Sequence, residues 1–196
     1  MSNNDVSPSA FDGLAALSEA IQSASAERPL RIVGGNTKAF YGRPVEGTPV
    51  STREHRGITS YDPVELIVSV RAGTLLSELE EALADQGQML PFEPPHFGAE
   101  ATVGGTIAAG LSGPRRPWAG SVRDFVLGLR VLDHQGREQR FGGEVMKNVA
   151  GYDLSRLMVG AQGTLGLITE VTLKVLPLPT ASASLPSASP SSQGSA

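Results

Sequence analysis

The sequence contains no cysteine, which excludes disulfide bonds and thiolate metal sites. Charged residues make up only 18% of the 196 residues, and the formal net charge is -4. This balance provides neither the basic surface that binds nucleic acid nor a polybasic stretch for anionic lipid. The three histidines, His55, His96 and His134, are scattered rather than spaced as metal ligands. We therefore expect no metal site and no nucleic-acid partner.

Long apolar runs are absent as well. No run is long enough to span a bilayer, and residues 1–9 lack the basic and apolar regions of a signal peptide. We expect a cytoplasmic protein without direct membrane insertion. Residues 180–196 are rich in serine, alanine and proline and carry no charge, so they cannot bury enough apolar surface to order themselves. The sequence predicts a folded domain over residues 11–179 between disordered ends at 1–10 and 180–196.

Hydrophobic periodicity predicts a mixture of helices and strands. Apolar residues recur at helical spacing over 11–24 and again after Thr74, which is expected to cap the second helix. Short β-branched or alternating runs predict strands at 30–33, 65–70, 125–132 and 167–175, and a hairpin return at 137–141. Helices and strands do not alternate with a regular βαβ period, so the predicted fold class is α+β.

Glycine, by contrast, is abundant, and its 23 residues cluster in three loops. Residues 33–38 follow a strand, and their glycines would let backbone amides approach an anion beside Lys38, although an ordinary turn has the same composition. Residues 101–110 carry no charge at a predicted helix start, which suits a pyrophosphate or close packing of the helix on a sheet. Residues 160–166 do not match GxGxxG, and the chain has no GxxxxGK[ST], so Rossmann and P-loop sites are disfavoured.

Other polar residues permit two interpretations each. Residues 120–124 and 147–154 place polar side chains among glycines, where they could bind a ligand or form satisfied turns. Arg115 and Arg116 could bind a carboxylate or remain a solvated pair. His96 precedes the second glycine loop and could approach a ligand, but a lone histidine is usually structural. His55 stands in a charged stretch and is expected at the surface.

The order and spacing of these segments resemble the PCMH-type FAD-binding domain shared by vanillyl-alcohol oxidase, D-lactate dehydrogenase and cell-wall enolpyruvyl reductases. The resemblance covers residues 11–179. Within that family, the stretches SGPRRP at 112–117, GSVRDF at 120–125 and GGEVMKNVAGYD at 142–153 are most similar to the FAD-binding subunit of bacterial glycolate oxidase. Each loop alone is a weak signal, and the ordered combination is specific.

The resemblance implies two α+β subdomains that clasp an extended FAD. Several relatives carry a histidine in the first loop that bonds covalently to the flavin, and here that region reads Gly35-Asn36-Thr37, so non-covalent FAD is expected. The residues implied in cofactor binding are Val33, Gly34, Gly35, Asn36, Thr37, Lys38, Thr102, Val103, Gly104, Gly105, Thr106, Ala108, Leu111, Gly120, Ser121, Asp124 and Ile168.

The resemblance also implies a function. FAD would accept a hydride from the α-carbon of a small 2-hydroxy acid such as glycolate, and the partners would be other subunits of a glycolate oxidase-like complex, through which the chain would reach the inner membrane. Family members continue into a cap domain that supplies most substrate contacts, whereas this sequence continues into residues 180–196, so we expect an incomplete substrate pocket. A non-catalytic FAD-binding or assembly subunit is the alternative, and an enolpyruvyl reductase-like enzyme using NADPH is a third.

Overall fold

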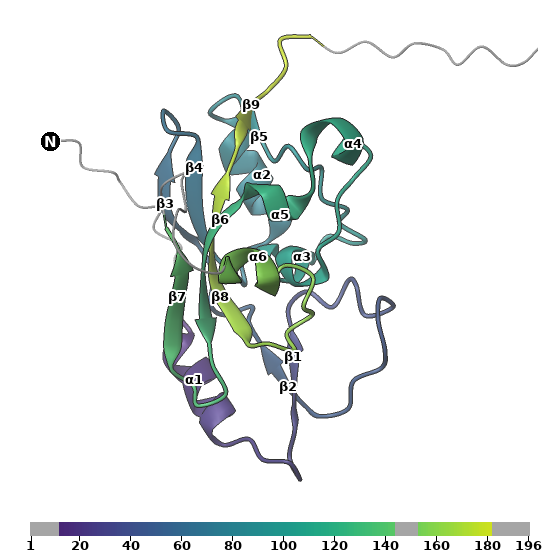
Figure 1. Ribbon diagram of the computed structural model, residues 1–196, viewed down its shortest axis with the longest axis vertical. Helices are drawn as coiled ribbons and strands as arrows, with labels where there is room; N and C mark the ends of the chain where they lie inside the picture. Colours follow the sequence, from purple (N-terminus) through teal and green to yellow (C-terminus); the bar gives the residue numbers. More distant parts are fainter. Residues whose placement is uncertain (1–11, 144–152, 182–196) are drawn as a thin grey trace, which may run out of the picture.

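A five-stranded antiparallel sheet of order β3-β4-β8-β6-β7 forms the centre of the fold (Figure 1). The computed structural model describes residues 12–143 and 153–181. The predicted end at 1–10, residues 182–196 of the predicted end at 180–196, and most of the motif at 142–153 lie outside the described residues. The strands of the sheet are β3 (Ile58–Asp62), β4 (Ile67–Arg71), β6 (Val126–Leu132), β7 (Glu138–Gly142) and β8 (Leu167–Lys174).

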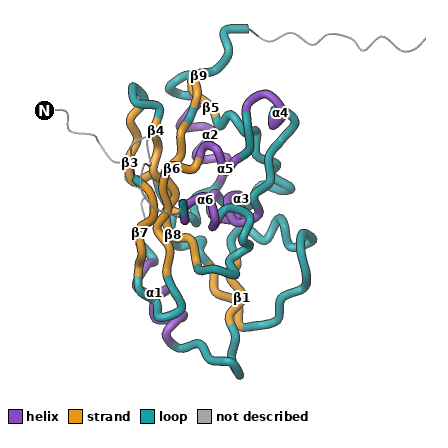
Figure 2. The backbone as a smooth tube through the Cα atoms, in the orientation of Figure 1, coloured by secondary structure: helices purple, strands orange, loops and turns teal. Residues whose placement is uncertain are grey.

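One face of this sheet carries the main hydrophobic core. Alternating residues such as Val68, Val70, Val171 and Leu173 are almost fully buried there. Three helices cover this face in Figures 1 and 2: α2 (Leu76–Ala84), α3 (Val103–Ala109) and α5 (Val122–Phe125). The short helices α4 (Arg116–Ala119) and α6 (Leu154–Met158) lie on the same side.

A smaller unit packs at one end of the sheet. It contains α1 (Leu14–Gln22) and the parallel pair of β1 (Leu30–Val33) and β2 (Thr48–Ser51). Leu17 of α1 packs with Leu132 and Leu167, and Val50 of β2 contacts this cluster. A further antiparallel pair joins β5 (Gln88–Met89) to β9 (Leu176–Pro177). The α+β prediction is confirmed, and the loop between β1 and β2 swings away from the sheet (Figure 2).

The predicted capping role of Thr74 is wrong. Helix α2 begins at Leu76 with Leu75 as its N-cap. The Thr74 hydroxyl instead accepts a hydrogen bond from the Gly57 amide and donates one to the Arg71 carbonyl, each at 2.8 Å. The Leu76 amide donates to the Ala101 carbonyl at 2.8 Å, so a distant segment satisfies the start of this helix. Sequence-local capping rules could not predict that partner.

His55 is also placed differently from the expectation. It is only 5% exposed, and its Nδ1 lies 3.4 Å from the Asp12 carboxylate. Burial lowers the pKa of His55, and the nearby Arg71 guanidinium lowers it further, against a smaller opposing effect of Asp12. His55 lies at a turn, where its carbonyl accepts a hydrogen bond from the Gly73 amide. The charged residues around it in the sequence led to the wrong expectation of a surface position.

In residues 12–143 and 153–181, no helix combines the length and the apolar character needed to cross a bilayer. Over the same ranges, no three histidine, aspartate or glutamate side chains gather where they could share a metal ion.

The buried His55 predicts a pH dependence of stability. The unfolded chain protonates this imidazole below about pH 6.5, whereas the folded protein resists protonation. The free energy of unfolding is therefore expected to fall as the pH decreases from about 6.5 toward the lowered pKa of the folded state. Urea unfolding at a series of pH values measures this, with the exposed His134→Gln as control. If the free energy of unfolding of His55→Gln depends on pH as steeply as that of the unsubstituted protein, the prediction is wrong.

Candidate functional site

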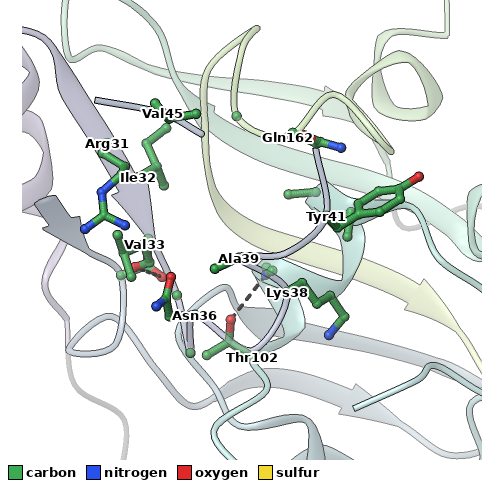
Figure 3. A pocket seen from close by; sticks show the side chains of 18 of the residues that line it. Arg31, Ile32, Val33, Asn36, Lys38, Ala39, Tyr41, Val45, Thr102 and Gln162 are labelled. Atoms are coloured by element: carbon green, nitrogen blue, oxygen red, sulfur yellow. Dashed lines mark hydrogen bonds between the residues drawn. The ribbon is translucent and has the colours of Figure 1, made fainter. Parts of the chain in front are cut away.

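A cleft of about 410 Å³ lies between the first glycine loop, α3 and the segment that leads into β8 (Figure 3). This volume falls within the range of roughly 300–1,000 Å³ typical of small-molecule sites. Eleven of the residues expected to bind the cofactor line it: Val33, Gly34, Gly35, Asn36, Thr37, Lys38, Thr102, Gly104, Gly105, Ala108 and Ile168. Segments 31–38, 102–109 and 162–168, far apart in the sequence, therefore share one cavity.

The first glycine loop supplies unpaired backbone amides to this cleft. Among the described residues, no protein acceptor is found for the amides of residues 34–38. Asn36 adopts a left-handed conformation with φ of 57°, a backbone geometry typical of the concave N–H nests that bind anions. Such a concave run of N–H groups is suited to bind an anion, because each N–H carries a partial positive charge. Without an anion, these N–H groups would have only water as a hydrogen-bond acceptor.

Close packing fixes the position of this loop. A Cβ atom at Gly35 would collide with the carbonyl oxygen of Glu100, and one at Gly34 would collide with the Thr102 hydroxyl. Both glycines are therefore required by the approach of the loop to residues 100–102, in addition to any role in ligand binding.

The second glycine loop shapes the cleft but does not offer free backbone amides to a ligand. The first-turn amides of α3 are already bonded within the protein: Val103 to the Thr74 carbonyl at 2.9 Å, Gly104 to the Ala72 carbonyl at 2.9 Å, and Gly105 to the Thr102 hydroxyl at 3.2 Å. A Cβ at Gly104 would lie 2.6 Å from the Ala72 Cβ, so this glycine allows α3 to pack on the end of β4. The structure thus favours close packing at Gly104 and locates the available donors in residues 34–38.

The cleft is positively charged although the chain as a whole is negative. Arg31, Lys38 and Arg43 line it, and none of the described lining residues is acidic. Lys38 donates to the His96 carbonyl at 3.4 Å, and its ammonium lies 5.9 Å from the centre of the Phe97 ring. Partial burial lowers the pKa of Lys38, because its charge has lost water without gaining a carboxylate partner. A bound anion would offset that loss.

The third glycine loop forms the wall opposite the first. The Gln162 amide donates to the Ala108 carbonyl at 2.9 Å, and a Cβ at Gly110 would lie 2.9 Å from the Gly160 Cα, so this loop packs tightly on the end of α3. Of the segment 162–168, only Ile168 had been expected at the site. The lining residues not expected from the sequence are Arg31, Ile32, Ala39, Tyr41, Arg43, Pro44, Val45, Thr52, Ala72, Ala109, Gln162, Gly163 and Gly166.

Six expected residues do not line the cleft. Val103 and Thr106 face the protein interior and are each 1% exposed. Leu111, Gly120, Ser121 and Asp124 lie beyond the C-terminal end of α3.

Residues 120–124 lead into the short helix α5, which has Ser121 as its N-cap and Asp124 in its first turn. Asp124 accepts hydrogen bonds from the Ser121 amide at 2.8 Å and from the Ser121 hydroxyl at 2.9 Å. The bond from the Ser121 amide is the main cause that lowers the pKa of the Asp124 carboxyl. The Val122 amide donates to the Ser112 hydroxyl at 2.9 Å, which ties the start of α5 to the segment that follows α3.

Two further candidates are engaged elsewhere. The Arg115 amide donates to the Glu93 carboxylate at 3.1 Å, and its guanidinium lies 3.8 Å from the same side chain. His96 Nε2 is 2.9 Å from the Glu80 carboxylate, and burial raises the pKa of that carboxyl. His96 does not line the cleft, and it contributes only its carbonyl to Lys38.

Comparison with known proteins identifies the family of this chain. The sequence profile described as "FAD binding domain" matches residues 12–142. The chain belongs to this family. FAD is accordingly its cofactor, and the profile includes the first two glycine loops. The third loop and β8 lie beyond the matched residues, although they complete the cleft and the sheet.

Individual relatives are similar over most of this chain. It is 61% identical over 171 residues to glycolate oxidase subunit GlcE of Escherichia coli (strain K12), covering 87% of this chain and 49% of that protein. It is 37% identical over 137 residues to glycolate oxidase subunit GlcD of Bacillus subtilis (strain 168), covering 69% and 29%. Alkyldihydroxyacetonephosphate synthase superposes with a TM-score of 0.65 at 25% identity, covering 86% and 30%. The chain spans about half the length of GlcE and less than a third of the others.

The charge of Lys38 is expected to contribute to FAD binding. Replacing Lys38 with Met removes a partly buried cation whose partner would be the diphosphate, so the Kd for FAD should rise about tenfold or more, as for other charge-assisted contacts. Isothermal titration calorimetry measures the effect. Lys174→Met, on β8 outside the cleft, is the matched control. Equal affinities for the Lys38 variant and the control would place the diphosphate elsewhere.

Proposed function

We propose that this chain is the FAD-binding part of a subunit of a glycolate oxidase-like complex. The observation that carries the proposal is a single cleft in which the free amides of residues 34–38 meet three cations without a carboxylate among the described lining residues. The identity of 61% with GlcE supports the assignment to this complex rather than to another FAD-dependent oxidoreductase.

The arrangement supports an extended cofactor. The diphosphate would lie against the amides of residues 34–38, beside Lys38 and the bare backbone of Gly105. Leu111 and residues 120–124 lie past the other end of α3, whose seven residues span roughly 10 Å. A dinucleotide running along α3 would reach both groups, so Leu111, Gly120, Ser121 and Asp124 are assigned to the far end of FAD. Ile168 would meet the adenosine or ribityl portion through its backbone.

The protein would hold FAD without a covalent bond. The described residues that line the cleft include no histidine, and the first loop carries Asn36 and Thr37 where several relatives have a covalently bound histidine. Bound FAD would supply the redox chemistry, which is the acceptance of a hydride from the α-carbon of a 2-hydroxy acid such as glycolate. The residues of this chain would bind and orient the cofactor.

The substrate contacts are assigned to other parts of the assembly. Arg115, the candidate for a substrate carboxylate, is paired with Glu93. GlcE is about twice as long as the matched region, and the name of GlcD indicates a further subunit of the relatives' enzyme. We therefore assign glycolate binding to the region corresponding to the remaining half of GlcE or to partner subunits, through which the assembly would also reach the inner membrane.

An absorption spectrum tests the cofactor assignment. The purified protein, or protein incubated with FAD, is expected to show visible flavin bands, and denaturation should release all of the pigment as FAD. Pigment that stays on the polypeptide would disprove the non-covalent attachment. A folded protein that remains colourless with excess FAD would overturn the proposed function.

A non-catalytic FAD-binding subunit is the second candidate. It is favoured by the lining of the cleft, where the described residues offer neither a histidine nor a carboxylate as a general base. Assembling the complex with Lys38→Glu, which places a negative charge against the diphosphate, separates the two possibilities. Loss of glycolate-dependent dye reduction is expected if this FAD takes part in catalysis. Unchanged reduction in a complex that lacks this FAD would establish the non-catalytic role.

A further inference from the structure

The segment of residues 39–47, here called the strap, borders the cleft and is held at both ends. At its start, the Tyr41 amide donates to the Lys38 carbonyl at 2.9 Å. Just after its end, the Thr48 amide donates to the Pro29 carbonyl at 2.9 Å as β2 begins. Figure 1 shows this chain bulging away from the sheet between β1 and β2. The strap is therefore held at both ends and arches outward between them.

The middle of the strap is weakly held. Among the described residues, none of the backbone groups of residues 42–47 takes part in a hydrogen bond. The strap also exposes large apolar side chains: Phe40 is 67% exposed, Tyr41 44% and Val45 62%. Few hydrogen bonds and exposed apolar surface are the properties of segments that open at low free-energy cost.

The strap nevertheless faces the site. Tyr41, Arg43, Pro44 and Val45 line the same cleft as the free amides of the first glycine loop. Arg43 is exposed, yet it borders the volume that Arg31 and Lys38 also border. An anion in the cleft would attract Arg43, and bound FAD would cover apolar surface of Tyr41 and Val45 that is exposed without it.

Two contacts position the strap. At its middle, Gln162 lies against Gly42, where an added Cβ would be 2.5 Å from the Gln162 Oε1 atom. The backbone of Gln162 is itself fixed, because its amide bonds to α3. At the start of the strap, the ring of Phe40 packs edge-on against that of Phe97, with centroids 5.0 Å apart.

We propose that the strap closes over the diphosphate of the bound dinucleotide, with Tyr41 and Arg43 as binding residues and Gln162 as the residue that positions it. This inference rests on the proposed function, in which FAD occupies the cleft. The proposal adds a conformational change of the strap. FAD enters when the strap moves away from Gln162, and FAD is retained when the strap returns to Gln162.

Chymotrypsin provides a direct test, because it cleaves after exposed aromatic residues such as Phe40 and Tyr41. The full chain is digested with and without saturating FAD, and FAD binding is measured separately by calorimetry. Cleavage within the strap is expected to slow about tenfold or more in the complex, as the open state is depleted by binding. If FAD binds and the cleavage rate does not change, the strap proposal is wrong and the proposed function stands. If FAD does not bind, the proposed function itself fails.

Variants test the individual roles. Gln162→Ala and Arg43→Gln are each expected to increase the FAD dissociation rate about tenfold, with a smaller change in association, and to reduce the protection of the strap. Arg43 is exposed, so its replacement leaves the folded core intact. Gln135→Ala, in the exposed hairpin turn, is the matched control for Gln162. Dissociation rates equal to that of the control in both variants would overturn the assigned roles.

Discussion

The cleft depends on one close approach between two backbones. Gly34 and Gly35 lie so near Glu100 and Thr102 that no side chain fits between them. This contact holds the unpaired amides of the first loop opposite α3. It also couples the small β1–β2 unit to the main sheet, because Thr102 caps α3 and its neighbours bond to the start of α2. A bulkier residue at Gly35 would separate these walls and remove the cavity between them.

Patterns local in sequence were sufficient for much of the fold. Residues 167–175 alternate as a strand does, and β8 follows at Leu167–Lys174. The turn at 133–136 joins β6 to β7 as expected. Errors arose where the decisive partner is distant along the chain. Thr74 was expected to cap α2, but Ala101 satisfies that helix, and His55 is buried despite its charged neighbours.

The candidate site was predicted in part for the same reason. The first two loops carry glycine patterns that the sequence displays, and both line the cleft. The sequence does not reveal which amides remain free, because Val103 and Gly104 bond to residues some thirty positions earlier. Arg31 and Arg43 enter the site through the folding of β1 and the strap, and neither belongs to a local motif. The glycines at 163 and 166 were the sequence signal from which the third wall of the cleft, residues 162–168, could have been predicted.

The position of β8 has a consequence for how the chain matures. This strand lies between β4 and β6, although it follows both of them in sequence. While the chain is being synthesised, β4 and β6 therefore expose two unpaired edges until residues 167–174 have emerged from the ribosome. Folding must wait for a long-range pairing, which is slow and leaves time for association with other chains. Among the described strands of this five-stranded sheet, β8 is translated last, and it completes the centre of the sheet rather than an edge.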